Sequence, residues 1–273
     1  MVTVLSSASI SDWRTREVSD AHWIVLSVVG VAAFTAYSIL ENGFKWEYVA
    51  LTAGSCLIVI DLFANTNRFL IIIYPAMAVL FAVPIYLLYI QGDPFTAAWT
   101  AIPASYTIFL LMYIFGAIPG GADIKCLMSL AFLFPVYPTM FALPLIGMIG
   151  NPLAEIFTFA VSALFLGAIL TMMVALPWIA NNLIRGEQGR ELILGRTMEL
   201  AEARTSHVWP MHDLEDGRLV RVHYIDDPAL IYDRLEAAGH ERIWVTPMVP
   251  FVVPLSMAAV ILAVIGNPLF LFI

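Results

Sequence analysis

Charged residues are scarce in this chain of 273 residues, and cysteine is nearly absent. Aspartate, glutamate, lysine and arginine together make up 12% of the sequence, whereas hydrophobic residues make up 61%. A soluble globular domain ordinarily carries about twice that share of charge. The composition therefore excludes an ordinary soluble protein and predicts a polytopic membrane protein, in agreement with the mean hydropathy of +0.87.

The chain also lacks the patterns that mark metal, nucleotide and nucleic-acid sites. Its two cysteines, Cys56 and Cys126, form no CxxC pair, and its five histidines have no zinc-site spacing. From these two observations we expect no disulfide and no metal. We also expect no cofactor, because the chain has neither a P-loop nor a dinucleotide fingerprint. The 13 basic residues are outnumbered by 21 acidic ones, which argues against nucleic acid as a partner.

Long apolar runs predict an all-α polytopic membrane protein with about seven to eight transmembrane helices. The first run, 1–11, is shorter than the ~20 residues of a full crossing and predicts a truncated or tilted helix that ends at Asp12. Prolines within the runs can bend or break the helices, so 125–150 could be two shorter pieces. The seven full candidate spans are 22–40, 48–62, 69–90, 97–116, 125–150, 154–179 and 250–273.

The composition and residue pattern between the last two spans are typical of a small soluble α+β module. The patterns predict a strand at 218–225, a helix at 228–238 and a strand at 241–245. The predicted domains are a transmembrane bundle (1–180), a cytoplasmic soluble insert (181–246) and a final transmembrane helix (247–273).

Basic residues predict the orientation of the chain in the cell membrane. Arg14 and Arg16 mark one side, and seven alternating spans return Arg68, Lys125 and the insert to that same side, which we expect to be cytoplasmic. The insert carries eight arginines and twelve acidic residues, a balance of −4. Such a balance is usually a solvated surface, and less often it attracts a cationic partner.

The stretch 115–130, FGAIPGGADIKCLMSL, places a single carboxylate beside two apolar runs. A charge in a membrane costs roughly 2.5 to 3.5 kcal/mol at mid-span, so a functional role is the default hypothesis for Asp123. Gly120, Gly121 and the small Ala122 would let a peptide approach it. The structural alternative is that Asp123 caps the helix that follows.

The predicted topology places Asp12 at the same cytoplasmic end as Asp123, although 111 residues separate them (123 − 12). Two carboxylates that share a site do not both ionise readily, so one keeps a proton. The charged member could then activate a water while the protonated member polarises a peptide carbonyl. This is the acid and base pair that peptide hydrolysis requires.

Two motifs resemble the archaeal preflagellin and type IV prepilin peptidases, which are membrane aspartic proteases of the GxGD class. One is Gly120-Gly121-Ala122-Asp123-x-Lys125, and the other is Asp12-x-Arg14-x-Arg16-x-Val18. The resemblance implies that Asp12 and Asp123 cleave short basic leader peptides from archaellin or pilin-like precursors at the cytoplasmic membrane face. The precursor and the lipid bilayer are the implied partners.

Other interpretations remain open for the charged residues near these motifs. Lys125 and Arg14 could support the catalytic pair, although both also serve as cytoplasmic anchors. Asp61 could pair with Arg68, or it could join Asp123 in a proton- or cation-coupled transporter, in which Asp61 would be essential and Asp12 dispensable. A catalytically silent filament-assembly relative and a protease that cuts in mid-membrane are further alternatives.

Overall fold

The computed structural model describes residues 1–64, 69–118, 120–139, 143–146, 158–215, 217–222 and 227–271. Most of these residues are helical, and five of the described helices are long and apolar enough to cross a membrane. This confirms the prediction of several membrane helices with a small strand-containing insert, but it does not confirm a count of seven to eight. The five are α2 (Asp20–Asn42), α3 (Trp46–Phe63), α4 (Leu70–Ile90), α5 (Thr96–Ile114) and α8 (Phe159–Ile184).

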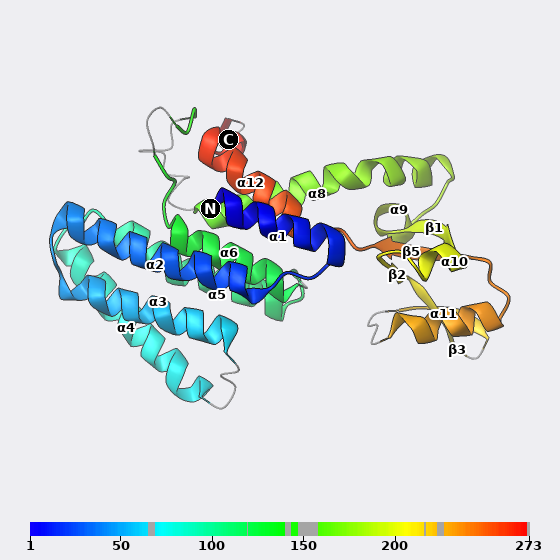
Figure 1. Ribbon diagram of the computed structural model, residues 1–273, viewed down its shortest axis with the longest axis horizontal. Coiled ribbons are helices and arrows are strands. Elements are labelled where there is room, and N and C mark those ends of the chain that lie inside the picture. Colours follow the sequence, from blue (N-terminus) through cyan, green and yellow to red (C-terminus); the bar gives the residue numbers. More distant parts are fainter. Residues whose placement is uncertain are drawn as a thin grey trace. The chain divides into compact units, whose positions relative to one another are not determined.

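The chain forms two compact units, which we call the helical unit (1–168 and 251–273) and the insert unit (169–250). Three further helices of the helical unit are shorter: α1 (Val2–Thr15), α6 (Gly121–Leu133) and α12 (Val252–Val264), the last followed by η1 (Pro268–Leu271). Within this unit α1 lies beside α12, α2 packs on α3 and α6, and α5 packs on α4 and α6 (Figure 1). Segments far apart in sequence, α1 and α12 above all, are thereby neighbours.

Small residues allow α2 and α6 to pack closely. A Cβ on Gly30 would lie 2.7 Å from the backbone nitrogen of Leu133, so only glycine fits at this crossing. Nearby, the buried hydroxyls of Ser27 and Ser129 are 2.9 Å apart and share a hydrogen bond. Close backbone approach and interhelical hydrogen bonds are the usual means of joining membrane helices. They fix the position of α6, the helix that carries Asp123.

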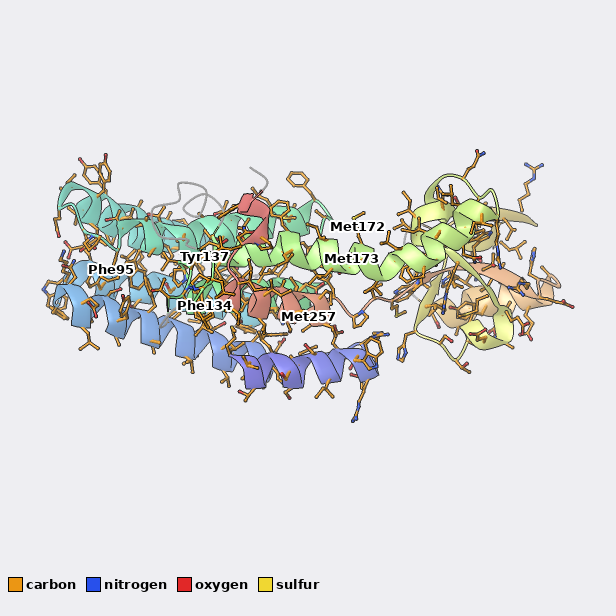
Figure 2. The ribbon with its side chains drawn as sticks, turned by 90° about the horizontal axis from the view of Figure 1, so that it is seen from above. Phe95, Phe134, Tyr137, Met172, Met173 and Met257 are labelled. Carbon is orange, nitrogen blue, oxygen red and sulfur yellow. The ribbon has the colours of Figure 1, made fainter. Side chains whose placement is uncertain are left out.

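One end of the helical unit, which we call the Asp93 end, holds an aspartate that is surrounded by hydrogen-bond donors. The Asp93 carboxylate accepts hydrogen bonds from Asn42 (2.7 Å), Tyr48 (2.7 Å), Lys45 and the Phe95 N–H (2.8 Å). Phe95 lies at this end of the helical unit in Figure 2. Burial would raise the pKa of Asp93, but these donors hold the pKa below its usual value.

Two helices end at positions that differ from the prediction. Helix α1 continues to Thr15, so Asp12 lies inside the helix and not after it. Helix α6 ends at Leu133, so a single helix over 125–150 is wrong. Phe134 precedes a proline, and such a residue is sterically biased away from the helical conformation. Of the remainder of that predicted span, 140–142 and 147–150 lie outside the described residues.

The segment after α6 is tied to the start of α8. Phe134 and Tyr137 lie near each other (Figure 2), and both rings pack against Phe159. The Tyr137 hydroxyl donates a hydrogen bond to Ser162 at 2.5 Å, and the Asn267 amide donates to the same oxygen at 3.0 Å. These buried hydrogen bonds join the segment after α6, helix α8 and the segment after α12.

The insert unit contains two small antiparallel sheets and three short helices. The strand order in the larger sheet is β1-β5-β2, and β3 pairs with β4 as a hairpin. The predicted helix at 228–238 and strand at 241–245 are present as α11 and β5, while β4 covers the first half of the strand predicted at 218–225, of which 223–225 lie outside the described residues. The elements are α9 (Arg190–Leu194), β1 (Arg196–Glu199), α10 (Leu200–Ala203), β2 (Val208–Pro210), β3 (His212–Glu215), β4 (Arg218–Arg221), α11 (Pro228–Ala237) and β5 (Arg242–Pro247).

Candidate active site

Asp12 is buried in the last turn of α1, and the end of this helix is well defined. Arg16 terminates α1 in the left-handed conformation, with φ of 59°. Its guanidinium donates hydrogen bonds to the carbonyl oxygens of Asp12 (3.1 Å) and Trp13 (3.2 Å). Arg16 therefore satisfies carbonyls at the end of the helix, which is also where the helix dipole favours a positive charge.

The Asp12 carboxylate binds the start of another helix. Its Oδ2 accepts a hydrogen bond of 3.0 Å from the backbone N–H of Val252, the first residue of α12. Three residues before Asp12, the hydroxyl of Ser9 donates to that of Ser256 at 2.9 Å, so α1 and α12 are joined at two places. The N-terminus of a helix carries a partial positive charge, which stabilises the ionised form of a carboxylate placed there.

Asp123 lies in the first turn of α6, where Gly120 is the N-cap. Because Gly120 and not Asp123 occupies the N-cap position, the structural alternative, in which Asp123 is the cap, is wrong. A Cβ on Gly120 would lie 2.3 Å from Oδ2 of Asp123, whereas a Cβ on Gly121 would meet no atom within 4 Å. The two glycines therefore differ in role, because Gly120 makes room for the Asp123 carboxylate and Gly121 leaves open space.

The fold brings Asp12 and Asp123 within electrostatic range of each other, and the fully buried Cys126 lies within range of both. Each carboxylate sits at a helix N-terminus, Asp12 at that of α12 and Asp123 at that of α6. Two acidic groups placed this way titrate as a pair and hold one proton between them over part of the pH range. We call this end of the helical unit the motif end.

The residues predicted to support the pair lie nearby but have other partners. Lys125 forms an ion pair with both carboxylate oxygens of Asp20, at 2.6 and 2.7 Å, and its ammonium lies 5.3 Å from the centre of the Phe63 ring. Arg14 is exposed in the last turn of α1, and Ala122 is partly buried beside Asp123. The ion pair of Lys125 therefore joins α6 to α2.

Asp61 lies in the last turn of α3 and accepts a hydrogen bond of 2.5 Å from the hydroxyl of Tyr106 on α5. The predicted ion pair of Asp61 with Arg68 stays a prediction, because 65–68 lie outside the described residues. Asp61 and Tyr106 line a cavity of about 200 Å³ that also reaches Gly121. The structure thus places Asp61 beside the glycine motif.

Sequence reasoning missed one polar partner of the site, the Val252 N–H. A backbone donor has no residue signature of its own, but Pro250 and Pro254 do mark a helix start, where N–H groups lack intrahelical partners. The sequence also gave no reason to separate Gly120 from Gly121. Only the rotamer of Asp123 makes that distinction.

Curated relatives resemble this chain over most of its length, while no protein-family model matches it. A preflagellin peptidase of Methanocaldococcus jannaschii is 26% identical, over 67% of this chain and 77% of the relative. Those of Methanococcus voltae and Methanococcus maripaludis are 24% and 23% identical, each over 95% of this chain and over 91% and 90% of the relative. These similarities agree with the resemblance of the two aspartate motifs, so both the motifs and most of the chain are similar to preflagellin peptidases.

Proposed function

We propose that this chain is a membrane aspartic endopeptidase that removes the short basic leader peptide from archaellin or type IV pilin-like precursors. The observation that carries the proposal is the approach of Asp12 and Asp123, which come from helices far apart in sequence. The names of the relatives support a peptidase that acts on preflagellin. The aspartic mechanism is inferred from the electrostatic proximity of the two acids.

In the proposed mechanism the two carboxylates share one proton. The ionised member removes a proton from a water molecule, the oxygen of which attacks the scissile carbonyl, while the protonated member donates a hydrogen bond to the carbonyl oxygen. Asp12 is the better candidate for the ionised member, because the Val252 N–H already stabilises its negative charge. The carboxylate that took the proton from the water then gives it to the departing nitrogen as the C–N bond breaks, and the two carboxylates again share one proton.

We further propose that cleavage takes place at the cytoplasmic face of the cell membrane. Arg14, Arg16 and Lys125 all belong to the motif end, and basic residues are retained on the cytoplasmic side of membrane proteins. An archaellin or pilin-like precursor would thus meet the site before its leader leaves the cytoplasm. The proposed side is testable by the accessibility of engineered cysteines at the two ends of the helical unit.

The test is cleavage of an archaellin precursor by the purified full chain in lipid nanodiscs, followed by the mobility shift of the product. Asp12→Asn and Asp123→Asn should each reduce turnover by about 1,000-fold or more, since each removes one half of the acid and base pair. Glu17→Gln is the matched control, because Glu17 is an exposed acid just after α1 and should leave turnover unchanged. Full activity of either aspartate variant would refute the proposed pair.

A further inference from the structure

Helix α8 is long and apolar enough to cross a membrane, and its second half belongs to the insert unit. Residues 159–180 include no charged side chain and no asparagine or glutamine. A bilayer has a hydrocarbon core about 30 Å thick, and a helix rises about 1.5 Å per residue. A crossing that begins at Phe159, the first residue of α8, therefore ends near Trp178, and tryptophan is a residue type enriched at the membrane–water interface.

The chain turns back along α8 after this helix ends. The Trp178 indole N–H donates a hydrogen bond to the carbonyl oxygen of Ile193 in α9, at 3.4 Å. One turn further along α8, the Asn182 amide donates to the carbonyl oxygen of Gly195 at 2.6 Å. Trp178 lies about 10 Å before Arg185 along the helix axis, at about 1.5 Å per residue. Ile193 is therefore back at the level where the crossing ends.

Large apolar side chains are exposed at this level. Ile193 and its neighbour Leu194 are both exposed in α9, as are Leu183 and Ile184 at the end of α8, and we call these four residues the α9 patch. Removing apolar surface from water stabilises by about 25 cal/mol per Å². Because α8 carries the patch to the edge of the bilayer, the surface that can cover it there is lipid.

The guanidinium of Arg185 lies directly after the α9 patch and is exposed. It donates a hydrogen bond to the neutral hydroxyl of Thr197 at 3.0 Å, and no acid among the residues that the structure describes forms an ion pair with it. A basic side chain near a membrane surface gains about 1 kcal/mol from anionic lipid headgroups. Apolar side chains next to a cation are the combination found in interfacial membrane anchors.

We infer that the α9 patch inserts into the interfacial layer of the lipid bilayer and binds the insert unit to the membrane surface. The partner is the lipid itself, with acyl chains against the patch and headgroup phosphates against Arg185. The inference goes beyond the proposed function and does not depend on it, because it requires only that α8 crosses the membrane. It gives the insert unit one face toward lipid and another toward water.

Helix α11 offers a matched control, because it lies on the other side of the larger sheet. The Trp244 ring of β5 lies against Gly195, directly after α9, whereas the adjacent Ile243 packs in the core with residues of α11. Adjacent residues of a strand face opposite sides of the sheet, so α9 and α11 are separated by it (Figure 1). Leu230 of α11 is 55% exposed and Ile193 is 54% exposed, so the two positions differ in face and not in exposure.

The experiment places the photoreactive amino acid p-benzoylphenylalanine at single positions of the full chain in lipid nanodiscs and measures the illuminated products by mass spectrometry. A probe at Ile193 should form lipid adducts with a yield within about twofold of a probe at Met173, which is exposed on α8 within the crossing (Figure 2). A probe at Leu230 should give about tenfold fewer lipid adducts, because α11 faces water. Lipid adducts require no cleavage, so the result is independent of the proposed activity.

Two outcomes at Ile193 would overturn the inference. The first is a yield of lipid adducts as low as that at Leu230, which would place α9 in water. The second is a product with twice the mass of the chain in place of lipid adducts, which would make the α9 patch an interface between two copies of the chain.

A second measurement tests whether the side chains of α9 hold it in the lipid or whether α8 merely carries it close by. Ile193→Asp adds a charge that opposes insertion, so the lipid adducts of a probe at Leu194 should fall severalfold. Leu230→Asp is the control and should leave the yield at Leu194 unchanged. Both substituted positions are exposed, so the fold should persist in each variant. An unchanged yield in Ile193→Asp would contradict an anchor formed by the α9 patch.

Discussion

The two ends of the helical unit each bury an aspartate, but they treat its charge in opposite ways. At the Asp93 end the carboxylate has four donors, including the Lys45 ammonium. At the motif end Asp12 accepts one backbone hydrogen bond and has another acid, Asp123, as its neighbour. A carboxylate that accepts hydrogen bonds from several donors contributes to stability. An acid held beside a second acid is instead suited to exchanging a proton.

The comparison shows that burial alone does not identify a functional aspartate. Asp12 and Asp93 have nearly equal exposure, 7% and 6%. What distinguishes them is the surrounding donor set and the proximity of another acid. Substitutions at the Asp93 end should change stability, whereas substitutions at the motif end should change activity.

The largest expected effect is on stability, at the Asp93 end. Asp93→Ala leaves Lys45 and Tyr48 without their acceptor and should lower the free energy of unfolding by about 3 kcal/mol, near the lower limit for a broken buried ion pair because Lys45 is partly exposed. Thermal unfolding in detergent measures the loss. Glu41→Ala, an exposed acid near the same end, is the control and should change little. Equal stability of the two variants would remove the distinction between the ends.

The next effect is on activity, at the motif end. Gly120→Ala places a methyl group where Oδ2 of Asp123 lies, so the carboxylate must turn away. We expect turnover to fall by about 100-fold, the cost of a displacement of about 1 Å in a catalytic group, with little change in melting temperature. Gly121→Ala serves for comparison and should lose less, because a Cβ on Gly121 meets no atom within 4 Å. A Gly120→Ala enzyme with normal turnover would show that the position of the Asp123 carboxylate is unimportant.

A smaller effect of opposite sign is expected when one of the paired acids is neutralised. At a pH where the pair has lost its shared proton, Asp123→Asn removes the repulsion between two like charges, so it should leave the free energy of unfolding unchanged or raise it by about 1 kcal/mol, while turnover is lost. Thermal unfolding and the cleavage assay on the same preparation measure both quantities. A destabilised Asp123→Asn protein would mean that Asp123, like Asp93, has mainly a structural role.

The pH dependence of stability should reflect the Asp93 end. Because the folded pKa of Asp93 is lowered from the usual 3.8, its contribution to stability is fully present above that pH and is lost as the pH falls through the lowered value. Acid unfolding of wild type and Asp93→Ala should therefore converge below pH 3.8. Curves that stay parallel to lower pH would contradict the assigned ion pair.

The smallest effect concerns the insert unit, where several acids already have arginine partners. Asp213 pairs with Arg234, and Arg204 contacts Asp233 and Glu236 at 2.7 Å each. Neutralising exposed acids without such pairs should lower kcat/KM for a basic leader by only about twofold, at low salt alone, if the insert attracts the leader. Unchanged cleavage at low salt would exclude this recruitment. Suitable residues are Glu199, Glu202, Glu215 and Glu241.

Much of the helical architecture could be predicted from the sequence, because apolar runs of membrane length leave few alternatives. Ser19, a residue type favoured at helix starts, caps α2 by accepting a hydrogen bond from the Ala21 N–H. The end of α6 was not predictable, since Leu133 is followed by prolines that membrane helices elsewhere tolerate, as α4 does at Pro75 and Pro84. Whether a proline ends a membrane helix depends on neighbours that can satisfy the freed carbonyls.

The sequence by itself determined the class of the protein and the pair of acidic motifs, because composition and local residue order are enough to specify both. Only the tertiary structure decided which contacts the motif residues make. The contact of Asp12 with the Val252 N–H joins positions 240 residues apart, and the steric difference between Gly120 and Gly121 depends on one side-chain rotamer. Contacts of this kind arise when helices that are far apart in the sequence pack together, so no single stretch of sequence predicts them.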